Sequence, residues 1–137
     1  MIIFTHHTGE PHGILGAQIA ATFFQRKLSI PAIVVGIERT FSKEGFFHFI
    51  DEHYSGREKL VAFSHLCGRK DLLELARDLK QNGFVTLLGG PQARQDYHGE
   101  PDAGTYPHRF RGLESVMDIA FQGPVDGLKP DTDPTPR

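Results

Sequence analysis

Polar or glycine-rich residues follow four apolar runs of this sequence, at the point where each run ends. These segments are residues 6–13, 64–66, 89–91 and 122–124. Glycines at such points remove side chains that would hold a ligand away from the backbone, and a serine hydroxyl offers a hydrogen bond. In open α/β sheets, ligands bind beyond the carboxyl ends of the strands. We therefore expect these segments to form one binding rim for a sizeable ligand.

The same residue types also fit purely structural roles. A pair such as Gly89-Gly90 commonly makes a tight turn, and Ser64 can hydrogen-bond a neighbouring carbonyl. Their recurrence at several strand ends of one sheet favours a ligand. The helix expected after the first segment adds small residues, which allow either a ligand or the sheet itself to approach closely: Gly13, Gly16, Ala17, Ala20 and Ala21.

Short apolar runs rich in Val, Ile and Phe predict the strands that position this rim. They are continuous rather than alternating, as in parallel sheets covered on both faces, and they span residues 1–4, 32–37, 60–66, 84–88 and 117–121. Apolar residues at helical spacing, among them Leu15 and Ile19, predict helices over residues 14–27 and 69–82, the second ended by Gly83. A third helix is indicated around Phe46, with Ser42 placed to cap its start.

Strand and helix therefore alternate along the chain, and the right-handed crossover rule then favours a three-layer α/β sandwich. We predict a flavodoxin-like (Rossmann-like), five-stranded parallel sheet. Residues 95–113 show no sustained period and are predicted to form a long loop with at most a short helix. We expect one domain over residues 1–128 and a proline-rich linker or tail over residues 129–137.

Composition limits the partners of such a domain. The 137 residues suffice for one core, and a formal net charge of −2 without a long Lys/Arg cluster argues against nucleic acid and anionic lipid. No apolar run approaches the ~20 residues that span a bilayer, and the first residues lack a signal-peptide pattern, so we expect a cytoplasmic protein without a membrane partner. Cys67 is the only cysteine, so this chain alone cannot build a cysteine-ligated cluster.

The order of these motifs resembles the cobalamin (B12)-binding domain, in the form found at the amino end of B12-binding radical SAM proteins. In that family Asp-x-His-x-x-Gly follows the first strand, Ser-x-Leu the third and Gly-Gly the fourth. Ser64-x-Leu66 matches the second of these elements, and Gly89-Gly90 matches the third. The resemblance covers roughly residues 1–128, and it lies in the order of the motifs more than in any single one.

The remaining similarities are partial. His6-x-x-Gly9 matches the first element, with Phe4 in place of the Asp. The stretches LLGGPQA (87–93) and MDIAFQGP (117–124) are similar to segments of the radical SAM subgroup.

This resemblance implies a set of cofactor-binding residues: His6, Gly9, His12, Gly13, Gly16, Ser64, Leu66, Gly89, Gly90 and Pro91. Ser64 would hydrogen-bond the displaced dimethylbenzimidazole, while Gly89 and Gly90 would let the nucleotide tail lie against bare backbone between the first and third strands. The corrin ring would lie over residues 6–13 and 90–98. His6 or His12 would be the lower ligand to cobalt.

The resemblance also implies an accessory role without catalytic residues in this chain. S-adenosylmethionine and a 4Fe–4S cluster would belong to a following radical SAM domain, in cis or in trans. The whole enzyme would be a radical SAM (iron–sulfur) oxidoreductase or methyltransferase.

Other interpretations of the same sequence remain open. The histidines at positions 6, 7, 12 and 65 can be imagined around zinc or iron. A flavin or nucleotide domain is the nearer alternative, although the first segment lacks a G-x-G-x-x-G phosphate loop. A third possibility is a docking module that has the fold but no cofactor.

Overall fold

The structure is a computed structural model that describes residues 2–6, 14–37, 41–55, 57–64 and 69–125 of the 137-residue chain. Strands and helices alternate along it. The strands are β1 (Ile2–His6), β2 (Ile33–Ile37), β3 (Leu60–Phe63), β4 (Val85–Leu88) and β5 (Ile119–Ala120). The helices are α1 (Leu15–Lys27), α2 (Lys43–Tyr54), α3 (Lys70–Gln81) and α4 (Gln92–Gln95).

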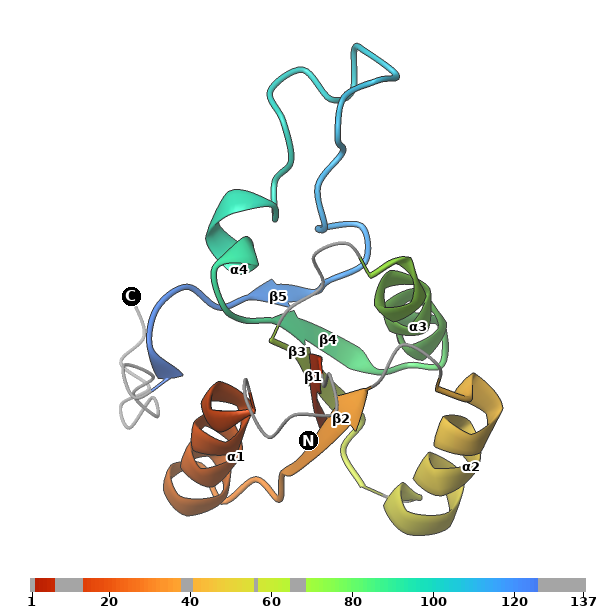
Figure 1. Cartoon of the computed structure of the whole chain (residues 1–137), viewed down its shortest axis with the longest axis vertical. Coiled ribbons are helices and arrows are strands. Elements are labelled where there is room, and N and C mark those ends of the chain that lie inside the picture. Colours follow the sequence, from red (N-terminus) through yellow and green to blue (C-terminus); the bar gives the residue numbers. More distant parts are fainter. Residues whose placement is uncertain (1, 7–13, 38–40, 56, 65–68, 126–137) are drawn as a thin grey trace, which may run out of the picture.

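The strands form one parallel sheet in the order β2-β1-β3-β4-β5. The chain therefore leaves β1 toward one side and then crosses back to continue on the other (Figure 1). Parallel neighbours need crossover connections, which α1, α2 and α3 supply between the first four strands. The predicted α/β class is confirmed: a parallel sheet is flanked by helices, and this arrangement is compatible with a Rossmann-like fold.

Helices cover the two faces of the sheet unequally. α2 and α3 lie on one side and α1 on the other (Figure 1). Side chains of β3 alternate between these sides, since Val61 and Phe63 join the core under α2 and α3 whereas Ala62 joins the core under α1. The first core is the larger one and includes the buried α3 residues Leu72, Leu75, Ala76 and Leu79.

The ends of α2 and α3 lie where local signals in the sequence predict them. Ser42 caps α2, because Gly45 N donates a hydrogen bond to Ser42 Oγ at 3.0 Å. Gly83, just beyond α3, has a φ of +80°, a left-handed conformation that glycine adopts at little cost. These two residues fix where the helices begin and end.

α1 packs on the sheet through small side chains and one aromatic ring. Ala17, Ala21 and Phe24 are buried beneath it. Leu15 and Ile19, which helped to predict the helix, are 66% and 52% exposed. The apolar period therefore located the helix correctly but does not mark its buried side.

Two predicted strands are shorter in the structure. β3 ends at Phe63, and a bend follows at Ser64. Before β5, Met117 N donates to Leu113 O at 2.8 Å and so belongs to a turn. β5 consequently contains two residues rather than the five expected from the apolar run.

A hydrogen-bond network joins the start of β5 to β4 and α3. Thr86 is fully buried, and its N–H donates to Asp118 Oδ2 at 2.9 Å while its hydroxyl donates to Val116 O at 2.8 Å. Lys80 Nζ lies 2.8 Å from Asp118 Oδ1. Partial burial raises the pKa of Asp118, but the hydrogen bonds from Lys80 and Thr86 outweigh this effect and hold the pKa below its ordinary value.

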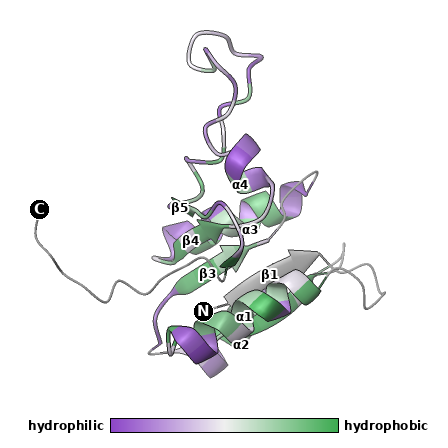
Figure 2. Ribbon diagram, turned by 90° about the vertical axis from the view of Figure 1, so that its left-hand side faces the viewer, coloured by the Kyte–Doolittle hydropathy of each residue, from purple (hydrophilic) through white to green (hydrophobic). Residues whose placement is uncertain are grey.

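Residues 96–118 connect α4 to β5 without a further helix or strand, in agreement with the predicted loop. Residues 99–112, here called the arm, project away from the sheet (Figure 1, Figure 2). The arm is closed at its base, because a Cβ on Gly112 would lie 2.6 Å from Gly99 N. Inside it, Glu100 N donates to Phe110 O at 2.9 Å.

Candidate functional site

The structure brings Ser64 and the glycine pair together at one edge of the sheet. Ser64 follows β3, and Gly89 and Gly90 follow β4, its hydrogen-bonded neighbour. Gly89 N donates to Phe63 O at 2.9 Å, so the β3–β4 pairing continues one residue beyond the strands. A Cβ on Gly90 would lie 2.6 Å from Ser64 O. The backbones of Ser64 and Gly90 are therefore in close contact.

The two glycines at this edge differ in why a glycine fits there. Gly90 has a φ of +74°, and any side chain on it would collide with the carbonyl of Ser64, so the fold itself requires a glycine. Gly89 has no such requirement, because its Cβ would meet nothing nearer than Phe63 O at 3.9 Å. Open space therefore remains beside Gly89, where a side chain would intrude.

Gly16 is a third glycine near this edge, on the exposed surface of α1. It lies in the first turn of the helix, and a Cβ on it would meet nothing within 4 Å. A glycine in a helix costs roughly 1 kcal/mol relative to alanine. Since α1 begins after the connection from β1, its first turn lies toward the edge where the strands end. No packing contact of the described residues explains a glycine at this position.

The Gly–Gly–Pro turn leads directly into α4 and is tied to the segment after β5. Pro91 precedes the helix with a φ of −58°, and Ala93 N donates to Gly90 O at 3.2 Å. Gln122 Nε2 donates to Ala93 O at 3.4 Å. Three of the four predicted rim segments, those after β3, β4 and β5, are thus neighbours at this edge.

Several predicted site residues lie outside the described ranges. They are Gly9, His12, Gly13 and Leu66, together with His7, His65 and Cys67. For His6 the structure describes the backbone at the end of β1, where it pairs with Ile37. Among the residues that are described, no group of three or more His, Cys, Asp or Glu side chains is placed to hold a metal ion. His48, His53, His98 and His108 are exposed.

An ion pair at the start of α3 was not predicted from the sequence. Arg69 Nε and Nη2 donate to the two carboxylate oxygens of Asp71 at 2.8 and 2.5 Å. The Arg69 side chain is 12% exposed, and its hydrogen bonds are the main reason why the pKa of Asp71 is lowered. This pair holds a guanidinium group near the edge where β3 ends. Its only signal in the sequence is a pair of opposite charges two residues apart, which by itself does not predict an ion pair.

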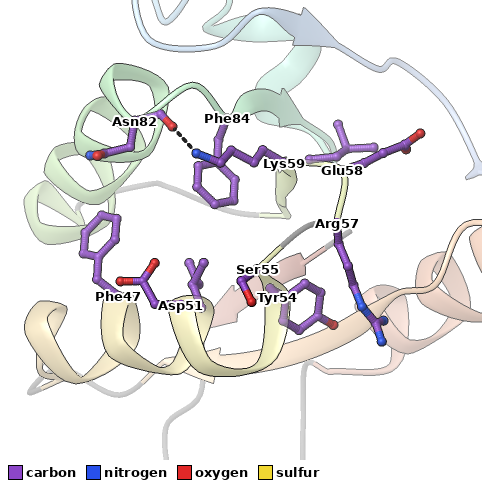
Figure 3. Close-up of a pocket in the computed structure, with 11 residues that line it drawn as sticks. Phe47, Asp51, Tyr54, Ser55, Arg57, Glu58, Lys59, Asn82 and Phe84 are labelled. Carbon is purple, nitrogen blue, oxygen red and sulfur yellow. Dashed lines mark hydrogen bonds between the residues drawn. The ribbon is translucent and has the colours of Figure 1, made fainter.

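A pocket lies at the opposite edge of the sheet, where β3 and β4 begin (Figure 3). Phe47 and Asp51 of α2 point into it, and Phe84 faces them from the other side. Lys59 Nζ donates to Asn82 O at 3.0 Å and lies 5.5 Å from the centre of the Phe84 ring. The pocket is built from segments far apart in the sequence, so no local pattern predicted it. It lies away from the carboxyl ends of the strands, where ligands of such sheets bind.

Comparisons with protein-family models, with curated proteins and with solved structures found no match for this chain. Within the described ranges, no helix is both long enough and apolar enough to cross a membrane. What the chain binds must therefore be argued from its own residues.

Proposed function

We propose that this chain is a cobalamin-binding domain with a flavodoxin-like sheet, and that it serves a radical SAM oxidoreductase or methyltransferase domain. The observation that carries this proposal is the contact between Ser64 and Gly90, with open space beside Gly89. It supports a site at the carboxyl ends of β3 and β4, where Ser64 brings a hydroxyl group and Gly89 leaves the backbone bare.

The strand order supports the location of this site. In flavodoxin-like sheets with the order 2-1-3-4-5, the ligand binds where the order reverses, between the first and third strands. The sheet described above has this order, and Ser64 is the residue that follows β3. A nucleotide-like tail entering beside Ser64 would therefore lie at the switch point.

The proposed roles follow from these positions. Ser64 Oγ hydrogen-bonds the dimethylbenzimidazole of the tail, and Gly89 leaves room for the tail to pass along the backbone. In this proposal Leu66 would line the binding site, and the corrin ring would lie over residues 6–13 and 90–98. His6 or His12 would hold the cobalt from below, while S-adenosylmethionine and the 4Fe–4S cluster would belong to the partner domain. When bound, cobalamin would supply a cobalt centre for methyl transfer or radical chemistry.

Titration with hydroxocobalamin tests this proposal. The chain should bind it with a dissociation constant of about 1 μM or less, seen as a change in the visible spectrum and by calorimetry. Gly89→Val should weaken binding at least tenfold, because its side chain fills the open space. Gly104→Val is the matched control, since a Cβ there meets nothing within 4 Å and the residue lies in the arm, away from the proposed site. Ser64→Ala should weaken binding by about 3- to 10-fold, as expected for one lost hydrogen bond.

The spectrum also separates the alternatives. If the nucleotide tail is displaced from cobalt, the visible spectrum of bound hydroxocobalamin should differ from that of the free cofactor. His6→Ala or His12→Ala should then change the spectrum of the bound cofactor again. Flavin mononucleotide is the comparison ligand, because flavins occupy the same switch point in flavodoxin. Binding of the flavin without binding of cobalamin would replace the proposed ligand. No binding of either would leave a docking module and contradict the proposal.

A further inference from the structure

Large exposed apolar side chains lie on α1, on the last two strands of the sheet and in the arm. Among the described residues six such side chains are exposed: Leu15, Ile19, Val85, Tyr106, Phe110 and Ile119. Tyr106 and Phe110 belong to the arm, and the other four belong to α1, β4 and β5. Contiguous exposed apolar patches on soluble proteins commonly mark interaction sites, so it matters which of these side chains share one face.

The two strand residues lie on the same face of the sheet as α1. Leu87 packs against the core under α1, so Val85, two residues earlier in β4, points to the same side. Ile119 pairs with Leu87 in the parallel register and therefore points to that side too. Val85 is 43% and Ile119 is 46% exposed. We call the surface formed by Val85, Leu87 and Ile119 the β4–β5 face.

Among the described residues, no helix lies over the β4–β5 face in the way that helices normally cover a parallel sheet (Figure 2). Parallel sheets occur almost only with both faces covered. Here α1 is the helix on this side, and Figure 2, which looks onto it, shows α1 below β4 and β5 rather than in front of them. On the opposite side, Leu88 and Ala120 of the same strands pack into the core under α2 and α3.

α1 itself has an apolar side that is not used against its own sheet. Leu15 and Ile19 are four residues apart, and the half-buried Phe23 follows at the same spacing. Residues at this spacing form one stripe along a helix. The chain therefore carries both an apolar sheet face that needs a helix and a helix with an unused apolar stripe.

We propose that two copies of this chain form a symmetric dimer in which α1 of each copy docks on the β4–β5 face of the other. A two-fold axis parallel to the strands places the partner's α1 beside the first copy's α1 and over β4 and β5. The docked helix then runs antiparallel to those strands, as α1 does on its own sheet. The contact is isologous, so each copy fills the space that the other leaves open. This proposal is independent of cobalamin binding, because it uses neither Ser64 nor Gly89.

Sedimentation equilibrium of the full chain over a range of concentrations tests the dimer. We expect a monomer–dimer equilibrium whose dissociation constant rises at least tenfold in Ile19→Glu and in Ile119→Glu. Tyr106→Glu is the matched control, since Tyr106 is 48% exposed in the arm, and it should leave the constant unchanged. A wild-type chain that stays monomeric at about 0.5 mM overturns the proposal. A dimer that Tyr106→Glu dissociates while Ile19→Glu and Ile119→Glu do not also overturns it. Growth beyond the dimer into open-ended oligomers overturns it as well, because the proposed contact is closed.

Cross-linking tests the contact directly in a Cys67→Ser background. When Ile19→Cys and Ile119→Cys chains are mixed and mildly oxidised, the mixed dimer should exceed either disulfide-linked homodimer at least fivefold. Predominant cross-linking between two Ile19→Cys chains would instead show that the helices meet each other, and would overturn the docking geometry.

Discussion

The two faces of the sheet are covered by different kinds of side chain. Under α2 and α3, large residues are almost completely inaccessible, such as Phe63 at 1% and Leu75 at 0% exposure. Under α1 the buried residues are mainly alanines, including Ala17, Ala21 and Ala62. Because apolar area buried sets most of the folding free energy, the first face should dominate stability. The second face should contribute less to folding and leave apolar surface for a partner.

The largest effect is expected on the well-covered face. Leu75→Ala removes a fully buried side chain from α3 and should lower the free energy of unfolding by about 2–5 kcal/mol. Leu15→Ala on α1 is the control, because 66% of that side chain is already exposed. Urea unfolding followed by circular dichroism measures both. Equal losses in the two variants would remove the distinction between the faces.

A smaller loss of stability is expected under α1, where enlarging a buried side chain rather than removing one is the test. Ala21 is 7% exposed, so Ala21→Leu must push the helix away from the sheet and should cost about 1–3 kcal/mol. Gln18→Leu, on the exposed part of the same helix, should stay within about 0.5 kcal/mol of wild type. If Ala21→Leu is neutral in denaturant unfolding, α1 does not lie as close to the sheet as its small residues indicate.

Acidification should weaken the hydrogen bonds and the ion pair by which Asp118 joins the start of β5 to β4 and α3. The folded pKa of Asp118 is below its ordinary value, so its contribution to stability is present above the unfolded pKa of about 3.9. That contribution is lost as the pH falls through the lower folded value. In Asp118→Asn this part of the pH dependence should disappear, whereas Asp51→Asn, on exposed α2 surface, should keep it. Unfolding midpoints measured from pH 7 to pH 2.5 decide between these outcomes.

The smallest effect on folding is expected at the proposed interface. At concentrations where the chain is monomeric, Ile19→Ser should change the free energy of unfolding by no more than about 0.5 kcal/mol, since 52% of the side chain is exposed. Thermal unfolding of dilute samples provides the measurement. A loss above about 2 kcal/mol would show that Ile19 belongs to the core of the monomer.

Much of the fold could be predicted because its signals are local. The apolar runs located the strands, Ser42 and Gly83 marked the helix ends, and the missing period correctly predicted a loop over residues 95–113. The buried side of α1 could not be predicted in this way. Leu15 and Ile19 have the spacing of a core stripe, but alanines on another side of the helix allow the closer approach to the sheet.

The candidate site could likewise be predicted only where its features follow from local sequence signals. That Ser64 and Gly90 would be neighbours followed from their positions after parallel strands, which end at one edge. The difference between Gly89 and Gly90 did not, because it depends on a positive φ and on where the carbonyl of Ser64 points. Contacts between residues distant in sequence, such as Thr86 with Asp118 and Lys80 with Asp118, left no local pattern either.

The closed base of the arm makes its length independent of the sheet. Since Gly99 and Gly112 meet there, residues inserted or deleted between them leave the spacing of β4 and β5 unchanged. We therefore expect a fluorophore, an affinity peptide or a longer insertion at this tip to leave the strand register unchanged. The arm is therefore a segment whose length can vary, and Gly99 and Gly112 fix the point where it joins the domain.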